Sequence, residues 1–240
     1  FLPLLPSRPT CYTTSISFLF TMSTQRIIFL NNTGVDSLCR GRYEEAIKCF
    51  RHAILLAKSA VETMEDSPHH THEGDGMDLV ASLPLNNMTD NEECYSNHMF
   101  DVYQRGFYLP KMNEHNHVGA EHEIPALTVV LLYNLGLSHH LAVLTGCCEN
   151  SETTLMEGLR YYQLALMTAR STQPGNHHNH TSVTNFFVLI LGCLTNMGHI
   201  FCLFWDHRQA KTCRGLLDRM LESSHHNGVP LPTADEDFFF

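Results

Sequence analysis

The sequence predicts an all-α protein made of three antiparallel helix pairs. One motif occurs three times: an apolar residue, an Asn two positions later and a Gly two positions after that, ending at Gly34, Gly136 and Gly198. Each motif is followed by a second stretch in which small and apolar residues recur at helical spacing. A unit of two helices that recurs along a chain indicates a stacked architecture. The 240 residues are enough for one domain with a substantial core.

The first pair is expected between Met22 and about Val61. Ser23 is a plausible N-cap for a helix that runs to about Cys39. After Gly41, the next helix opens with Tyr43-Glu44-Glu45, where the helix dipole favours acidic side chains. Residues 1–21 lack helical periodicity, so we expect a disordered or non-native N-terminal segment. A signal peptide is the alternative, but three prolines interrupt its apolar run and it lacks a clear basic start.

The other two pairs are expected after residue 123. Pro125 suits the first turn of a helix that runs to about Leu144, and Ser151 can cap the partner helix at 155–169. The third pair is predicted at 183–204 and 206–223. The helical domain therefore spans 22–223, and 224–240 is predicted to be a disordered acidic tail. The run 186–205 is also long enough to be a transmembrane helix, although it contains polar residues and the repeated motif.

A long insertion, 62–123, separates the first pair from the second. It is rich in Asp, Glu, His, Asn, Gly and Ser, and we expect it to be largely disordered or a functional loop. Residues 99–110 differ because they are dense in aromatic side chains, which indicates an extended segment or a weak hairpin. We expect Phe100–Leu109 to dock on the helices of the same chain, while 66–88 stays mobile.

Composition argues against several classes of partner. The chain has 15 basic and 25 acidic residues, a formal net charge of −10, which disfavours nucleic acid and anionic membranes. Its nine cysteines are odd in number and include no CxxC pair. Reduced, mostly buried thiols in a cytoplasmic protein are the expected state, with a disulfide framework as the alternative.

The repeated units resemble the tetratricopeptide repeat, which has a small residue on its first helix and an Ala-x3-aromatic pattern on its second. The second unit has about ten extra residues between its helices, and the third has Arg214 where the family has an aromatic residue. The matching residues are Leu30, Gly34, Gly41, Tyr43, Ala46, Phe50 and Ala53; Leu132, Leu135, Gly136, Gly158, Tyr162 and Ala165; and Leu194, Met197, Gly198, Phe201 and Ala210. The resemblance implies a right-handed α-α superhelix.

The resemblance also implies a function. Proteins of this family bind an extended or helical peptide on the inner surface of the stack, so we expect a protein–protein interaction scaffold and not an enzyme. None of the implied inner residues is Lys or Arg, so the clamp that some relatives use for a C-terminal carboxylate is missing. The residues implied to bind are Asn31, Val35, Leu38, Tyr133, Leu137, His140, Thr195, His199 and Cys202.

Catalytic signals are weak by comparison. There is no GxSxG, HExxH, phosphate-binding loop or dinucleotide fingerprint. Most of the 17 histidines fall in polar connections, where ligands are not held rigidly, so we expect no metal site and no cofactor. A His-based metal-dependent enzyme remains the alternative. We also expect Gly136 and Gly198 to lie at close helix contacts.

Overall fold

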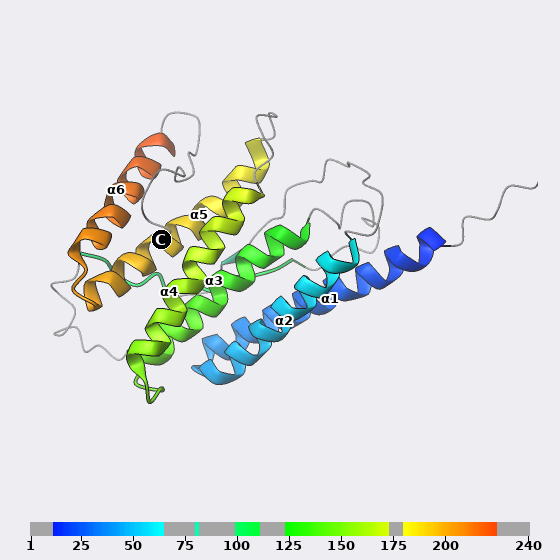
Figure 1. Ribbon diagram of the computed structural model, residues 1–240, viewed down its shortest axis with the longest axis horizontal. Helices are drawn as coiled ribbons and strands as arrows, with labels where there is room; N and C mark the ends of the chain where they lie inside the picture. Colours follow the sequence, from blue (N-terminus) through cyan, green and yellow to red (C-terminus); the bar gives the residue numbers. More distant parts are fainter. Residues whose placement is uncertain (1–11, 65–79, 82–98, 111–122, 173–179, 225–240) are drawn as a thin grey trace, which may run out of the picture.

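The computed structural model describes residues 12–64, 80–81, 99–110, 123–172 and 180–224 (Figure 1). Within these ranges the protein is all-α, as predicted. The helices are α1 (Tyr12–Cys39), α2 (Tyr43–Met64), α3 (Glu123–Leu144), α4 (Ser151–Ser171), α5 (His180–Leu203) and α6 (His207–Ser224). Two short strands, β1 (Val80–Ala81) and β2 (Phe107–Tyr108), form the only sheet in the described ranges.

The helices pack in the order in which they occur along the chain. Each contacts the next one, and Figure 1 shows them as a row from α1 to α6. Short turns join α1 to α2, α3 to α4 and α5 to α6, which makes the members of each pair antiparallel. The turns share one geometry: Gly41, Gly146 and Trp205 each follow a helix with a φ of 60 to 71°. In each case the next residue's N–H donates to a carbonyl five residues back, the hydrogen bond that closes a Schellman motif.

Glycines bring the helices of the first two pairs close together. A Cβ built on Gly34 would lie 2.6 Å from the Phe50 ring of α2, and one on Gly136 would lie 3.0 Å from the Tyr162 ring of α4. Close approach of this kind needs a residue without a side chain on one helix. The prediction of a close helix contact is confirmed for Gly136. For Gly198 it is wrong, because the nearest atoms belong to Phe100 outside the helices.

Several element boundaries differ from those expected. α1 begins at Tyr12, so Ser23 lies inside the helix and 12–21 are helical. The N-cap of α4 is Asn150, whose side chain accepts a hydrogen bond from the N–H of Thr153 at 3.2 Å. These two helices extend beyond the regions of clear apolar periodicity.

The insertion contains described structure at two places. Strand β2 pairs antiparallel with β1, with Phe107 opposite Ala81 and Tyr108 opposite Val80. The pairing is therefore with a distant strand and not a hairpin within 100–109. Val80–Ala81 falls in the stretch expected to be mobile. The described residues do not include the rest of that stretch, 1–11, 225–240 or most of the histidines expected in connections. His180, which was expected in a connection, begins α5.

The most apolar helix is α3. Within the described residues it is the one helix long and apolar enough to cross a membrane, judged by length and composition, and 83% of its apolar stretch is buried inside the protein. The apolar part of α5, Phe187–Leu203, is shorter and packs between α4 and α6. Both helices supply the core shared by neighbouring pairs.

Candidate functional site

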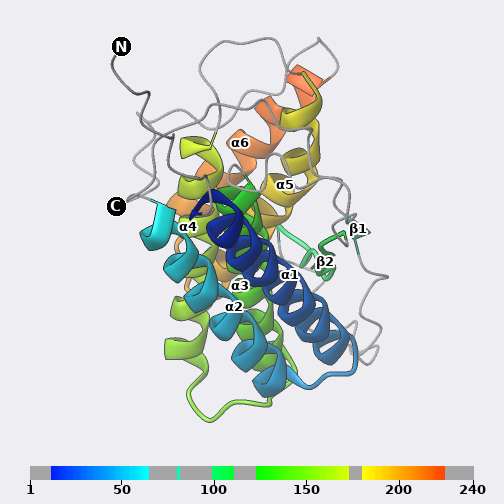
Figure 2. The ribbon, with the colours of Figure 1, turned by 90° about the vertical axis from the view of Figure 1, so that its right-hand side faces the viewer.

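An extended stretch from the insertion, Met99–Pro110, lies against helices from all three pairs. We call it the docked segment. It meets α5 through Phe100 and Tyr103, then α3 through Phe107, and finally α1 through Leu109. Figure 2 shows its strand β2 beside α1. Phe100, Phe107 and Leu109 are all buried. This is the stretch whose aromatic residues were expected to pack on the helices.

Three asparagine side chains hold the main chain of the docked segment. The Asn196 side chain accepts from the N–H of Tyr103 at 2.7 Å and donates to the carbonyl of the same residue at 3.2 Å. The Asn134 side chain does the same with Phe107, accepting at 2.9 Å and donating at 2.8 Å. Each side-chain amide thus replaces the pair of hydrogen bonds that a neighbouring β-strand would supply.

Asn32 completes the series on α1. It accepts from the N–H of Leu109 and donates to the carbonyl of Leu109, both at 2.9 Å. These three residues, the asparagine ladder, are the Asn of the three repeated motifs, each two residues before a Gly. One amide from each helix pair therefore holds one residue of the segment, and each pairing satisfies both main-chain groups of that residue.

Further hydrogen bonds surround the asparagine ladder. Asn31 donates to the Phe107 carbonyl at 3.0 Å, and its side-chain oxygen accepts from Asn134 at 2.9 Å. The Tyr133 hydroxyl lies 3.1 Å from the carbonyl oxygen of Arg105, to which it can donate. Asn31, Tyr133 and Asn134 are fully buried, so these bonds form away from water, where an unpaired polar group is costly.

Side chains of the segment also contact the helices. Gly106 lies against Val35 and Leu38 of α1, and a Cβ on it would lie 3.2 Å from Val35. The Tyr108 hydroxyl donates to the Asp36 carboxylate at 2.8 Å. Burial, and then the hydrogen bond to Asp36, raise the pKa of Tyr108, which therefore stays neutral. The docked segment is therefore held by hydrogen bonds to its main chain and by contacts of individual residues such as Gly106 and Tyr108.

The residues implied by the repeat resemblance have different positions. Asn31, Val35, Leu38 and Tyr133 contact the docked segment, and Cys202 lies near the main chain of Met99. Leu137 is buried in the core and Thr195 is partly buried. His140 and His199 contact each other, with their ring nitrogens 3.0 Å apart.

The ladder itself was missed in the sequence. The resemblance directed attention to the residue three positions before each Gly, whereas the Asn two positions before it makes the paired hydrogen bonds. The signal was available, because an Asn at the same place in three motifs is more than an apolar core requires. The sequence does not show which residues these asparagines bind, because their partners are 27 to 93 positions away.

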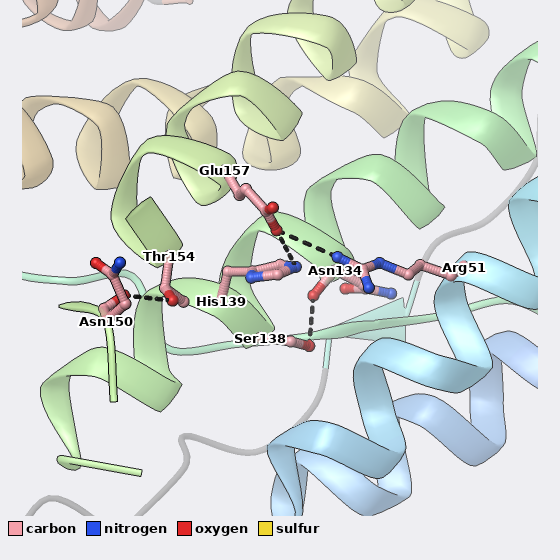
Figure 3. A network of polar contacts seen from close by, with 7 residues as sticks. All are labelled: Arg51, Asn134, Ser138, His139, Asn150, Thr154 and Glu157. Carbon is pink, nitrogen blue, oxygen red and sulfur yellow. Dashed lines mark hydrogen bonds and ion pairs between the residues drawn. The ribbon is translucent and has the colours of Figure 1, made fainter. Parts of the chain in front are cut away.

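A second polar cluster lies where α2, α3 and α4 meet. Figure 3 shows Glu157 of α4 between His139 and Arg51, at 3.5 and 3.2 Å. Burial lowers the pKa of His139 to about 4, against the opposing effect of Glu157, so the ring is neutral at pH 7. Burial also lowers the pKa of His140. Among the described residues, no three His, Cys, Asp or Glu side chains are placed to hold a metal ion.

The described cysteines are all unpaired. Cys193 and Cys213 are buried, Cys147 is exposed, and the others are partly buried, so the expected burial holds for only some of them. Cys11 and Cys94 lie outside the described residues. Burial raises the pKa of Cys193, which keeps this thiol protonated and unreactive.

Comparison with models of protein families, with characterised proteins and with solved structures finds no match for this chain. The geometry of its own residues is therefore the basis for a functional assignment. The feature with the clearest chemistry is the asparagine ladder, which binds a length of extended polypeptide through groups that almost every residue possesses.

Proposed function

We propose that this protein is an interaction module in which a right-handed stack of three helix pairs, similar to tetratricopeptide repeats, binds an extended segment of a partner protein. The binding surface is the face of α1, α3 and α5 that carries the asparagine ladder. The observation that supports the proposal most directly is the paired hydrogen bonding of Asn32, Asn134 and Asn196 to three residues of an extended chain.

The ladder suits peptide binding because it recognises main-chain atoms. A side-chain amide offers one donor and one acceptor, which match the carbonyl and N–H of any residue other than proline. Main-chain hydrogen bonds of this kind provide affinity when an extended peptide adds to a protein edge, and side-chain contacts then provide specificity. The ladder groups are uncharged, which favours an internal segment of the partner over a C-terminal carboxylate.

In this proposal the docked segment is an internal ligand. It belongs to the same chain, so its effective concentration at the surface is high. A partner segment must compete with it. The competing view is that the docked segment is a permanent part of the fold. Phe100 and Phe107 are both buried, and the two views predict different results when these side chains are replaced.

The test weakens the internal ligand and measures peptide binding. The full chain carrying Phe100→Ser and Phe107→Ser is used to select from a display library of random 12-residue peptides, with the wild-type chain as comparison. We expect enrichment by the variant and little by the wild type. Adding Asn134→Ala should then weaken the selected peptides at least about tenfold, because two hydrogen bonds of about 1 kcal/mol each are lost.

Controls make the outcome decisive. Circular dichroism establishes whether each variant keeps its helices, and Asp101→Ala, at an exposed position of the docked segment, should behave as the wild type does. A variant that loses its helices would show that the segment is structural. A folded variant that enriches no peptide, or one whose peptides ignore Asn134→Ala, would contradict the proposed function.

A further inference from the structure

Each helix pair has an aromatic ring packed against the Gly of its motif. In the first pair the Phe50 ring lies beside Gly34, and in the second the Tyr162 ring lies beside Gly136. In both cases the ring comes from the partner helix. Beside Gly198 in the third pair the ring is Phe100 of the docked segment, and a Cβ on this Gly would lie 2.5 Å from its Cζ.

The partner helix of the third pair does not supply that ring. Phe50 is sixteen positions after Gly34, and sixteen positions after Gly198 the residue is Arg214. The Arg214 side chain is 55% exposed and pairs with Asp218 at 3.1 Å, four residues further along α6. The ring beside Gly198 therefore comes from the polypeptide that occupies the face, whereas in the other two pairs it belongs to the helices.

We propose that the space beside Gly198 is a binding pocket for one aromatic side chain of the partner peptide, and that this pocket sets which peptides bind. This inference rests on the proposed function. It specifies a peptide with an aromatic residue three positions before the residue that Asn196 holds, as Phe100 precedes Tyr103. The internal ligand fills the pocket whenever no partner does.

The pocket has the features of an anchor site. Phe100 is 4% exposed, so its ring is almost completely removed from water. Buried aromatic side chains contribute much of the binding free energy at protein interfaces, while the contacts around them contribute little individually. Main-chain hydrogen bonding by the asparagine ladder accepts almost any residue. Selectivity must therefore come from sites such as this, where the shape of one side chain matters.

The inference is tested with synthetic peptides and the full chain carrying Phe100→Ser, which empties the pocket. Three labelled peptides have the sequence of 99–110: unchanged, with Phe100→Ser, and with Asp101→Ala as the matched control. Fluorescence anisotropy gives their affinities. We expect the unchanged peptide and the Asp101→Ala peptide to bind equally, and the Phe100→Ser peptide to bind at least about tenfold more weakly.

A second receptor variant tests whether the pocket is the cause. In the chain that carries both Phe100→Ser and Gly198→Ala, the added methyl group occupies the place of the ring, so the advantage of the unchanged peptide should fall below about threefold. An advantage that persists in this receptor overturns the inference, as does equal binding of the Phe and Ser peptides to the first receptor.

The remaining outcomes are also decisive. If the Phe100→Ser chain is unfolded alone, recovery of its helical circular dichroism with each peptide replaces the affinity measurement. Recovery with the unchanged peptide and not with the Ser peptide supports the pocket, whereas recovery with both or with neither overturns it. Library peptides that bind through Asn134 but lack an aromatic residue at the specified position would defeat this inference and leave the proposed function intact.

Discussion

Replacing Asn134 by Ala removes the α3 member of the asparagine ladder, which is fully buried. Its side chain accepts from the Phe107 N–H at 2.9 Å, donates to the Phe107 carbonyl at 2.8 Å and donates to the Asn31 side-chain oxygen at 2.9 Å. The bond that its own main-chain carbonyl accepts from Ser138 is unaffected. The substitution therefore deletes two hydrogen bonds to the docked segment and one between α3 and α1.

The expected cost follows from those bonds and their burial. Each contributes about 1 kcal/mol net, and Asn134 is fully buried, so water cannot easily reach the Phe107 N–H that is left behind. We expect the free energy of unfolding to fall by about 3 kcal/mol. For a protein of this size that corresponds to a decrease in Tm of roughly 6–12 °C.

Urea unfolding followed by circular dichroism measures the change, with Asn150→Ala as control. Asn150 undergoes the same chemical change at an exposed helix cap, where its side chain accepts one hydrogen bond, from Thr153. Losing that cap should cost about 1 kcal/mol. If Asn134→Ala costs no more than Asn150→Ala, the ladder does not hold the docked segment in the way that the hydrogen bonds indicate.

The other predictions concern packing, acidity and backbone strain. Gly34→Ala should cost about 1–3 kcal/mol in urea unfolding, because its Cβ would lie 2.6 Å from the Phe50 ring, whereas Gly215→Ala, with its nearest neighbour at 3.8 Å, should be neutral or stabilising by up to about 1 kcal/mol. Equal changes in stability for Gly34→Ala and Gly215→Ala would contradict the close contact between Gly34 and the Phe50 ring. The pKa of His139 is about 4 in the folded protein and 6.5 in the unfolded chain, so as the pH falls the unfolded chain takes up the proton first. The free energy of unfolding should therefore fall by about 3 kcal/mol as the pH drops from 6.5 to 4. A His139→Gln chain with the same pH dependence would exclude this cause. Trp205→Gly should raise Tm slightly, by the equivalent of about 1 kcal/mol or less. The reason is that Trp205 is 80% exposed and its φ of 60° suits Gly. A lower Tm would show that the Trp205 ring contributes packing.

Patterns that depend on local spacing could be predicted from the sequence. Capping residues, the repeated Gly motif and runs of apolar residues located the six helices of the described residues, and Gly136 marks a close contact because its neighbour Tyr162 belongs to the next helix. Aromatic density singled out 99–110 in an otherwise polar insertion. These inferences share one physical basis, because a few adjacent residues are enough to indicate that a helix face or an aromatic cluster is buried.

Partners that are distant in the sequence could not be predicted in this way. Nothing near Gly198 indicates that its ring comes from Phe100, because that pairing depends on how the insertion crosses the helices. The same holds for Asn196. From the sequence it is only a polar residue in an apolar helix, and its role follows from its hydrogen bond with Tyr103 in the structure. Helix boundaries such as Tyr12 were missed because α1 extends beyond the residues whose periodicity reveals it.

The order in which the docked segment meets its helices has a consequence for how the chain acquires its structure. The segment precedes α3 and α5 in the sequence, yet its Tyr103 binds Asn196, which is 93 residues further on. During synthesis Asn32 is made first, and the set of contacts can close only after α5 has left the ribosome. Local helix pairs form quickly, whereas contacts across long loops carry a larger entropic cost. We expect the amide of Tyr103, which donates to Asn196, to become protected from hydrogen exchange after the helices do, and pulse labelling during refolding would measure that delay.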